Sequence, residues 1–239
     1  MKKIILSLFI VVVTFSSKAQ VTFGIHGNFI VASVKERDFL NYGAASPDEN
    51  MEWDKGMIPS WKFGAVMNLP ISENISFQPQ LNILSKGGKF SSTFSESDMG
   101  FTFDFDVDLL FNLTYLELPL NFVYNTDKFF IGAGPSLSYG LDGEAKLKYK
   151  LTYDDGTGEQ TDSGSETENV EFEDSDDEES LNLKPFELGA NFLAGYKINN
   201  NIFINAHFNL GLSNISPYED TEFKNRYFGI GVGYFFNRK

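Results

Sequence analysis

Apolar and polar residues alternate along eight stretches of this chain, and a period of two predicts β-strands that each have one apolar and one polar face. The connections between the stretches are alternately long and short, which is typical of strands that run up and down beside their sequence neighbours. The predicted strands cover residues 21–34, 60–70, 75–91, 115–124, 128–141, 185–198, 202–213 and 226–237.

The apolar faces of these strands are free of charge. They comprise 46 positions without one Asp, Glu, Lys or Arg, although 22% of the chain is charged. The opposite faces hold amides and ionisable side chains, so one side of the sheet suits hydrocarbon and the other needs hydrogen bonds. We therefore predict an all-β fold, an eight-stranded antiparallel up-and-down transmembrane β-barrel of the bacterial outer membrane. Because eight strands leave an interior that side chains just fill, we expect no open diffusion pore.

The lengths of the connections predict the orientation of this barrel. Residues 71–74, 125–127 and 199–201 form short turns, and the other connections are long. In outer-membrane barrels the short turns face the periplasm, so we expect periplasmic termini and long extracellular loops.

Two of the long connections keep the strand alternation. Residues 101–109 and 145–153 alternate strictly, so we expect strands that continue past the membrane, and a ten-stranded barrel remains open if the first segment pairs within the bilayer. In the second connection we expect a flexible tip at 154–165. The lysines Lys146, Lys148 and Lys150 are expected to face Glu171 and Glu173 of the returning arm.

Three prolines lie inside predicted strands, at Pro79, Pro119 and Pro135. Proline has no N–H group to donate, and a closed barrel has no edge strand to tolerate that loss. We therefore expect bulges or breaks in the sheet beside them.

The first residues have the form of a secretory signal peptide: two lysines, an apolar run at 4–15, and Ser17 and Ala19 before the cleavage point. Cleavage after Ala19 would leave one barrel domain of residues 20–239 and change the net charge from −14 to −17, because three lysines are removed. This acidity makes nucleic acid an unsuitable partner. The chain has no cysteine, which excludes disulfides, thiolate nucleophiles and cysteine metal ligands.

Much of the negative charge lies in one connection, residues 142–184, which holds 15 acidic and 4 basic side chains. This composition is typical of a solvated, partly disordered extracellular loop; a site for divalent cations or for an extracellular partner is the alternative. A second, weak candidate for a cation site is the set Asp104, Asp106 and Asp108. Successive members lie about 7 Å apart on one strand face, so a single Ca²⁺ would need ligands from another loop.

The polar faces predict a hydrogen-bonded network in the lumen. Its candidates are Lys62, Lys86, Glu117 and Glu187, because an isolated charge there would be costly. The only histidines, His26 and His207, fall in the same phase and are expected to be hydrogen-bonded lumen residues. No serine lies two positions from His207, where a nucleophile could pair with it. We therefore predict no catalytic residue, no cofactor and no bound metal.

Four strings resemble the small PorT-like outer-membrane β-barrel proteins, often labelled porin family, of Bacteroidetes-type bacteria. They are SFQPQLNILSKGGKF (76–90), YLELPLNF (115–122), FFIGAGPSLSYGL (129–141) and YFGIGVGYFF (227–236). The resemblance implies a fold and a location, and no enzymatic activity. It also implies that residues 227–236 are the signal read by the barrel-insertion machinery, although this chain ends in Asn237-Arg238-Lys239 instead of an aromatic residue.

We therefore expect an integral outer-membrane protein, surrounded by outer-membrane lipid, with a structural or surface-interaction role through its extracellular loops. Two alternatives remain open. A secreted lipocalin-like barrel that binds a small ligand would need charges on its outside, against which the 46 uncharged positions argue. An outer-membrane enzyme would need a catalytic group, and the sequence offers none that is convincing.

Overall fold

The computed structural model describes residues 21–38, 40, 53–98, 101–154, 158–173 and 181–236. The predicted signal peptide and the C-terminal residues 237–239 lie outside this part of the chain. Within it, no helix is both long and apolar enough to cross a membrane.

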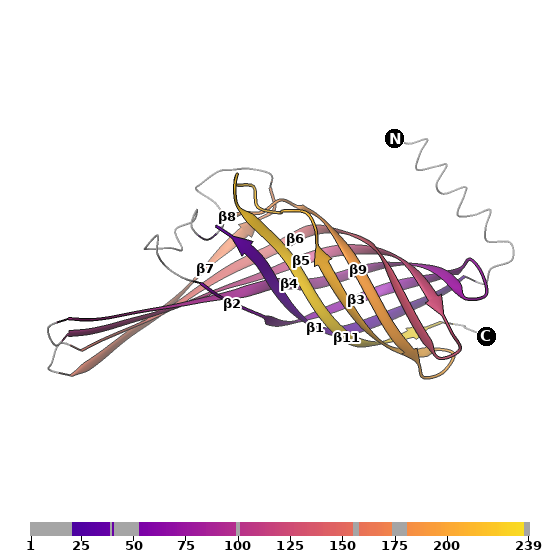
Figure 1. The fold of residues 1–239 in the computed structure, drawn as a ribbon, viewed down its shortest axis with the longest axis horizontal. Coiled ribbons are helices and arrows are strands. Elements are labelled where there is room, and N and C mark those ends of the chain that lie inside the picture. Colours follow the sequence, from indigo (N-terminus) through magenta and orange to yellow (C-terminus); the bar gives the residue numbers. More distant parts are fainter. Residues whose placement is uncertain are drawn as a thin grey trace.

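Eight long antiparallel strands close into a ring (Figure 1). Going round the ring, the order is β1-β3-β4-β5-β6-β9-β10-β11, and β11 pairs with β1 to complete it. The predicted eight-stranded barrel is confirmed, and ten strands are excluded because residues 101–109 form the start of β5. The bounds are β1 (Thr22–Arg37), β3 (Ile58–Pro70), β4 (Ile75–Asp98), β5 (Phe101–Asn125), β6 (Phe129–Asp154), β9 (Phe186–Lys197), β10 (Ile202–Gly211) and β11 (Glu222–Phe235).

The short turns all lie at one end of the barrel, which we call the short-turn end. Each is closed by a backbone hydrogen bond: from Ile71 N to Ile75 O (2.8 Å), from Thr126 N to Phe129 O (2.8 Å) and from Ile198 N to Ile202 O (2.9 Å). The opposite end, the long-strand end, carries the long connections.

At the long-strand end, four strands continue far beyond the barrel (Figure 1). We call this part the projecting sheet; it comprises residues 91–98 of β4, 101–112 of β5, 142–154 of β6 and 159–171 of β7. The prediction that the 101–109 and 145–153 segments continue as strands is confirmed. Within it, β7 (Glu159–Glu171) pairs with β6, and two short elements complete the sheet: β2 (Asp54–Gly56) pairs with β4, and β8 (Leu181–Asn182) with β7.

The predictions of a flexible tip at 154–165 and of a partly disordered acidic loop at 142–184 are wrong for most of these residues, which belong to β6 and β7. Residues 159–165 belong to β7 and pair one by one with β6. Their Ser, Thr and Gly content suggested a loop, but the strict alternation of β6 gives them a template strand. The lysines of β6 consequently do not face Glu171 and Glu173: Lys148 lies opposite Ser165 and, on its other side, opposite Asp108 of β5.

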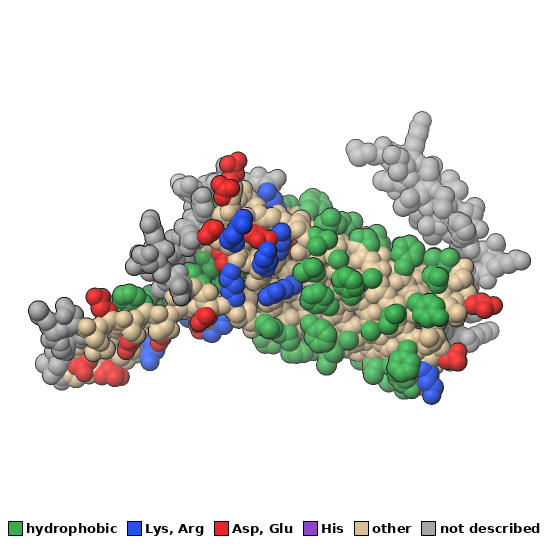
Figure 2. Space-filling view, in the orientation of Figure 1, with side chains coloured by type: hydrophobic (Ala, Val, Ile, Leu, Met, Phe, Trp, Pro, Cys, Tyr) green, Lys and Arg blue, Asp and Glu red, His purple; other side chains and the backbone are tan. Residues whose placement is uncertain are grey.

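The uncharged faces form a continuous apolar belt around the barrel. None of the 46 predicted outward positions is buried, and large side chains such as Phe23 and Phe122 are 58% and 57% exposed. Figure 2 shows one side of this belt as the green zone on the barrel wall. Exposure of so many large apolar side chains in one band is what a hydrocarbon environment favours.

The lumen is filled in three layers. At the short-turn end, six buried apolar side chains pack together, and at the long-strand end a larger apolar cluster includes Ile30, Phe111, Tyr115 and Phe223. A layer of buried polar residues, among them Lys62, Glu117 and His207, lies between the two clusters, and further buried polar residues such as Ser76 and Lys86 lie at the level of the clusters themselves. The six-residue cluster consists of Val66, Val123, Phe130, Leu193, Phe203 and Phe235.

The prolines interrupt the sheet without shifting its register. Pairs are missing beside Pro79 in the β3–β4 ladder, beside Pro119 in the β4–β5 ladder and beside Pro135 in the β5–β6 ladder, and the same register resumes afterwards. The expected bulges or breaks are therefore present, in the form of breaks. The one shift in these ladders lies elsewhere, between Thr114 and Tyr115 opposite β6.

Beyond the belt, the two faces of the wall exchange polarity. In β5 the apolar residues are the outward, even-numbered ones from Leu116 to Tyr124, and the inward, odd-numbered ones from Phe103 to Leu113. In β6 the apolar residues are odd-numbered on both sides of the membrane edge. A bulge there turns the odd-numbered side chains from the outer to the inner face, because Tyr115 pairs with Gly140 whereas Thr114 pairs with Asp142. This inversion marks where lipid ends and water begins on the outer face.

We predict that Gly87→Ala destabilises the barrel by more than about 1 kcal/mol. Gly87 has a φ of 148°, and a Cβ there would overlap the carbonyl oxygen of Phe111. Gly158→Ala is the matched control, because Gly158 has a φ of 143° but nothing within 4 Å of its Cβ position. Urea-induced unfolding of both variants measures the difference; equal losses would mean that only backbone strain, and not the contact with Phe111, matters at position 87.

Candidate functional site

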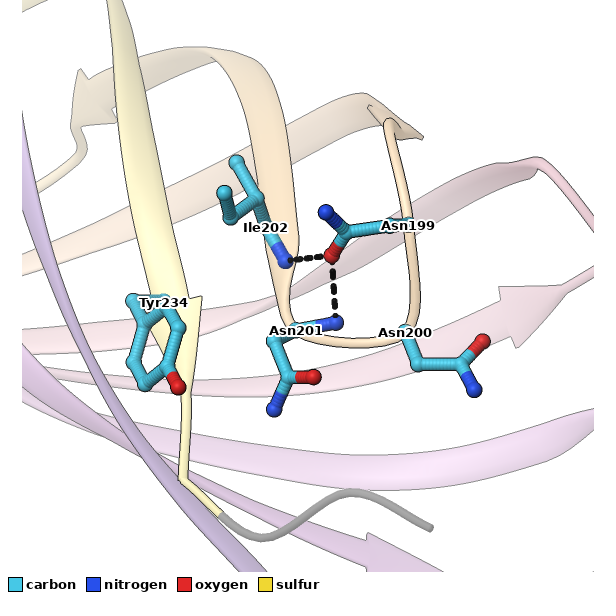
Figure 3. A pocket seen from close by; sticks show the side chains of 5 residues that line it. All are labelled: Asn199, Asn200, Asn201, Ile202 and Tyr234. Atoms are coloured by element: carbon cyan, nitrogen blue, oxygen red, sulfur yellow. Dashed lines mark hydrogen bonds between the residues drawn. The ribbon is translucent and has the colours of Figure 1, made fainter.

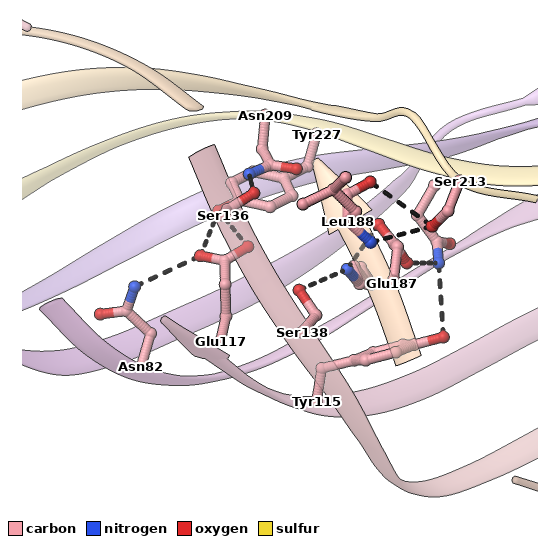
Figure 4. Close-up of polar contacts among 12 residues, drawn as sticks. Asn82, Tyr115, Glu117, Ser136, Ser138, Glu187, Leu188, Asn209, Ser213 and Tyr227 are labelled. Carbon is pink, nitrogen blue, oxygen red and sulfur yellow. Dashed lines mark hydrogen bonds and ion pairs between the residues drawn. The ribbon is translucent and has the colours of Figure 1, made fainter. Parts of the chain in front are cut away.

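The first buried ion pair of the lumen joins β3 to β5. Lys62 Nζ lies 3.2 Å from Glu117 Oε1, and both side chains are 0% exposed. The hydroxyl of Tyr227 donates to both oxygens of the Glu117 carboxylate, at 2.8 and 3.0 Å, and Asn82 Nδ2 lies 3.3 Å from Oε1. Figure 4 shows Asn82 and Tyr227 converging on Glu117. These donors supply the hydrogen bonds that a carboxylate needs when it is removed from water.

The second ion pair joins β4 to β9. Lys86 Nζ lies 3.0 Å from Glu187 Oε1 and 4.1 Å from the centre of the Tyr115 ring. Asn225 Nδ2 donates to the other carboxylate oxygen of Glu187 at 2.8 Å. Ser138 completes the surroundings of Lys86, with its hydroxyl 3.4 Å from Nζ.

The structure thus brings the four predicted network residues together as two separate pairs. Sequence reasoning missed Tyr227, Asn225 and Tyr115, whose polar atoms complete the pairs. The available signal was their phase, because all three fall on inward positions of their strands.

The two histidines lie in the same polar layer but join neither carboxylate. His26 Nδ1 is bonded to Asn28 Nδ2 at 2.7 Å, and the His207 ring lies edge-on to Tyr227 with centroids 6.3 Å apart. The Nε2 atoms of both rings have no hydrogen-bond partner among the described residues. In the same part of the chain, no three His, Asp or Glu side chains lie together in a way that could hold a metal ion.

The aspartates of the weak cation site lie on the polar face of the projecting sheet. Each accepts one hydrogen bond from a hydroxyl of β4: Asp108 from Ser91 (2.7 Å), Asp106 from Thr93 (2.9 Å) and Asp104 from Ser95 (2.5 Å). Lys89 Nζ also lies 2.9 Å from Asp108 Oδ1. Partial burial raises the pKa of Asp108, but the bonds from Lys89 and Ser91 outweigh this and keep its pKa below the usual value. These carboxylates point along a row and do not converge.

The other face of the projecting sheet is apolar. Phe94 pairs with Phe105, which pairs in turn with Leu151, and Phe103 pairs with Tyr153. Phe94, Phe103 and Tyr153 are 44%, 40% and 37% exposed, so this face remains open toward the far end of the sheet. We call the following set the apolar face: Phe94, Phe103, Phe105, Val107, Tyr149, Leu151 and Tyr153.

A hollow at the short-turn end, between β10 and the end of β11, belongs to a turn. It is lined by Asn199, Asn200, Asn201, Ile202 and Tyr234 (Figure 3). The side-chain oxygen of Asn199 accepts bonds from the backbone N–H groups of Asn201 and Ile202, both at 2.8 Å. The asparagine thereby stabilises the turn between β9 and β10, and asparagine side chains commonly do so.

Beyond the belt on the β1–β11 side, one carboxylate serves two lysines. Glu222 lies 3.1 Å from Lys35 Nζ and 2.7 Å from Lys224 Nζ. Hydrogen bonds from Lys224 and then Lys35 lower the pKa of Glu222 to about 2.

We expect this lowered pKa to appear in the pH dependence of stability. Above the usual value of 4.5, Glu222 is ionised in both the folded and the unfolded chain, and its contribution is fully present. As the pH falls from 4.5 toward 2, the unfolded chain binds the proton first, so the contribution is lost. The free energy of unfolding should therefore fall more steeply over this range for the wild type than for Glu222→Gln, and parallel curves would contradict the assignment.

Comparison with known proteins gives the family. Residues 15–216 match the outer membrane protein beta-barrel domain, a match that ends before β11. Among proteins with curated functions, no sequence matches this chain.

The solved structures found are distant. Ail, the attachment invasion locus protein of Yersinia pestis, is 13% identical over 91% of this chain and 99% of its own, with a TM-score of 0.37. Neisserial surface protein A is 11% identical over 91% and 99%, with a TM-score of 0.35, and OprG of Pseudomonas aeruginosa is 12% identical over 91% and 97%, with a TM-score of 0.32. At this level of similarity none of them bears on function. The family match spans most of the chain and its description names a membrane barrel and no reaction. This chain belongs to the outer membrane protein β-barrel domain family, whose place is the bacterial outer membrane.

Proposed function

We propose that this protein is a surface-binding protein of the outer membrane. In this proposal the barrel anchors the chain, the long-strand end faces the cell exterior, and the projecting sheet binds a partner through its apolar face. The observation that carries the proposal is the exposure of Phe94, Phe103 and Tyr153 on a sheet that stands clear of the belt. Exposed aromatic clusters with polar surroundings are typical of interaction sites.

The charge around the apolar face favours a basic partner. The projecting sheet carries 13 acidic and 3 basic side chains. On the apolar side itself, Glu96 lies opposite Phe103, and Asp162 and Glu166 lie opposite Leu151 and Leu147. A polypeptide with apolar residues next to lysine or arginine complements this pattern.

The filled lumen argues against a carrier or a pore. Two apolar clusters fill the barrel, with the Lys62–Glu117 pair between them and the Lys86–Glu187 pair beside Tyr115 of the larger cluster, and Lys62, Lys86 and Glu117 are 0% exposed. A lipocalin-like carrier would need space at this level for its ligand. Planar-bilayer recording of the purified protein should accordingly give no steady large current.

The route to the membrane is part of the proposal. We infer export through the signal peptide with cleavage after Ala19, short turns and termini in the periplasm, and insertion guided by the last strand. The likeness to PorT-like barrels supports these inferences. Divalent cations remain a second class of candidate partner for the acidic segment at 142–184.

The absence of native cysteine makes the orientation directly testable. A single cysteine replaces Ser163 on β7 in one variant and Asn200 in the short β9–β10 turn in another. A membrane-impermeant maleimide added to intact cells should label S163C and should label N200C only after lysis. Labelling of N200C alone on intact cells would reverse the proposed orientation.

Binding is tested with the protein in lipid nanodiscs and two fluorescent peptides. In one peptide leucine alternates with lysine, and in the other leucine alternates with glutamate. We expect anisotropy to report binding of the lysine peptide only, and loss of that binding in F94S/F103S/Y153S. The control S95A/T152A/T161A changes the opposite face of the same strands and should bind normally. Equal binding of both peptides, or normal binding by the first variant, would refute the assignment of the apolar face.

A further inference from the structure

Basic side chains gather directly above the belt on β1 and β11. After the last apolar outward residues, Val31 and Phe228, the outward positions are Ser33, Lys35 and Arg37 on β1, and Arg226, Lys224 and Glu222 on β11. Figure 2 shows a group of blue side chains at the edge of the green belt, where Figure 1 places the ends of these two strands. We call Lys35, Arg37, Lys224 and Arg226 the basic rim.

The register sets the members of the basic rim side by side. Lys35 and Lys224 are direct cross-strand partners, and Ser33 is the partner of Arg226. Like charges directly opposite one another destabilise a strand pair, and the two lysines share a single carboxylate, that of Glu222. An additional anion at this place would relieve the repulsion.

The arginines have charge to spare for such an anion. Within the described chain, Arg226 makes one hydrogen bond, from Nε to the uncharged Ser33 Oγ at 2.8 Å. Arg37 is the cross-strand partner of Glu222, but the carboxylate of Glu222 is bonded to the two lysines; the contact of Arg37 with Asp38 is a long 3.9 Å, and its side chain is 66% exposed.

Composition does not account for this cluster. The chain has a net charge of −14, and on the opposite side of the ring β6 presents exposed Asp142 and Glu144 just beyond the belt. The rim of the barrel is therefore positive on the β1–β11 side and negative on the β6 side. This places the positive side away from the acidic projecting sheet.

The height of the cluster matches a layer of lipid head groups. Arg226 lies two residues beyond Phe228, and Lys35 and Lys224 lie four residues beyond Val31 and Phe228. With a rise of about 3.4 Å per residue and a strand tilt of about 40°, these steps are roughly 5 and 10 Å along the membrane normal. Head groups occupy roughly 5–8 Å on each side of the hydrocarbon. Arg226 therefore lies within this layer, whereas Lys35 and Lys224 lie just above it, within reach of their long side chains, and the acidic Glu222 lies another two residues farther out.

We propose that the basic rim binds the phosphate groups of anionic lipids in the leaflet at the long-strand end. Arginine pairs with phosphate oxygens through two parallel N–H donors, and lysine adds a mobile positive charge. The neighbouring belt residues hold the acyl chains of the same lipids. The site thus selects lipids by head-group charge on one side of the barrel.

Trp61 provides a local reporter. It lies on β3, beside Phe29 of β1, and is 41% exposed in the belt. In a W53F background it is the only tryptophan of the chain. Nanodiscs of phosphatidylcholine containing a fixed fraction of either acyl-brominated phosphatidylglycerol or acyl-brominated phosphatidylcholine then show which lipid collects near Trp61.

We expect the brominated anionic lipid to quench Trp61 more strongly, with a local excess of roughly fivefold, the factor that one basic side chain near an anionic surface supplies. The excess should fall in high salt and disappear in K35Q/K224Q/R226Q. The control K146Q/K148Q/K150Q removes three charges from the projecting sheet and should retain the excess. Glu222→Gln, which removes only the competing carboxylate, should increase it.

Three results would overturn the proposal: no preference in the wild type, a preference unchanged in K35Q/K224Q/R226Q, or equal loss in the β6 lysine control. The last result would mean that net charge alone attracts the lipid. If K35Q/K224Q/R226Q does not fold, an unchanged preference in Glu222→Gln contradicts the proposal on its own.

Discussion

Lys62→Met should lower the free energy of unfolding by about 3–5 kcal/mol, the cost of breaking a buried ion pair from one side. The substitution leaves Glu117 as a carboxylate with 0% exposure and no cation beside it, although Tyr227 and Asn82 still donate to it. Urea-induced unfolding in phospholipid vesicles measures the loss.

Two further variants separate this effect from lost packing. Lys62→Met with Glu117→Gln removes both charges, so it should be clearly more stable than Lys62→Met alone. Lys35→Met makes the same substitution at a lysine that is 63% exposed and bonded to Glu222, and it should lower the free energy of unfolding by at most about 1 kcal/mol. If Lys35→Met and Lys62→Met cost the same, the buried pair does not have the role that its geometry indicates.

Leu118→Arg should cost about 2–4 kcal/mol, because it places a charge on the lipid face of β5. Leu118 is 37% exposed and lies beside Leu137 of β6 within the belt. The guanidinium would have to reach the head groups or carry water into the hydrocarbon. Folding into vesicles, followed by urea titration, gives the free energy.

Asn112→Arg is the matched control for this prediction. Asn112 is on the same strand and also points outward, but it lies beyond the belt and is exposed to water. We expect a change within about 1 kcal/mol. An inward control is unsuitable, because Asn121 is 0% exposed and bonded to Asn191 at 2.9 Å, so an arginine there would be overpacked. Similar free-energy costs for the two substitutions would mean that the edge of the membrane does not lie between positions 112 and 118.

The barrel could be predicted because lipid imposes a simple rule on alternate residues. Every strand from β1 to β11 that belongs to the ring has a predicted counterpart, and the outward phase holds for positions as different as Trp61 and Gly27. The ends of the strands were less predictable. The strand predicted to end at Ser91 continues to Asp98, and the strand predicted to begin at Tyr115 begins at Phe101. Both are longer than predicted because the hydrogen bonds between the strands continue beyond the lipid.

The lumen and the projecting sheet show why side-chain partners could not be read from sequence. That Lys62 and Glu117 need partners follows from burial, but the choice of Tyr227 depends on the stagger of strands far apart in the chain. The lysines of β6 were matched with the wrong glutamates because β7 already begins at Glu159, so that Lys146, Lys148 and Lys150 lie opposite Thr167, Ser165 and Ser163. The bulge at Leu141 in the β5–β6 ladder was not predicted either. The sequence did contain a signal for this bulge. In β4 and β5 the apolar residues change between odd and even numbers at the membrane edge, whereas in β6 they stay on odd numbers, so β6 needs one extra residue there to remain in register.

The exchange of polarity between the two faces of the wall also fixes how deep the protein sits. From Phe23 to Val31 the outward face of β1 spans eight residue steps, which is about 27 Å along the strand and roughly 20 Å across the bilayer at a tilt near 40°. If the barrel moved outward, phenylalanines of the belt would be exposed to water; if it moved inward, Arg226 and Asp142 would enter the hydrocarbon. The protein therefore cannot adapt to a thicker bilayer by moving, so the surrounding lipid must thin to meet it.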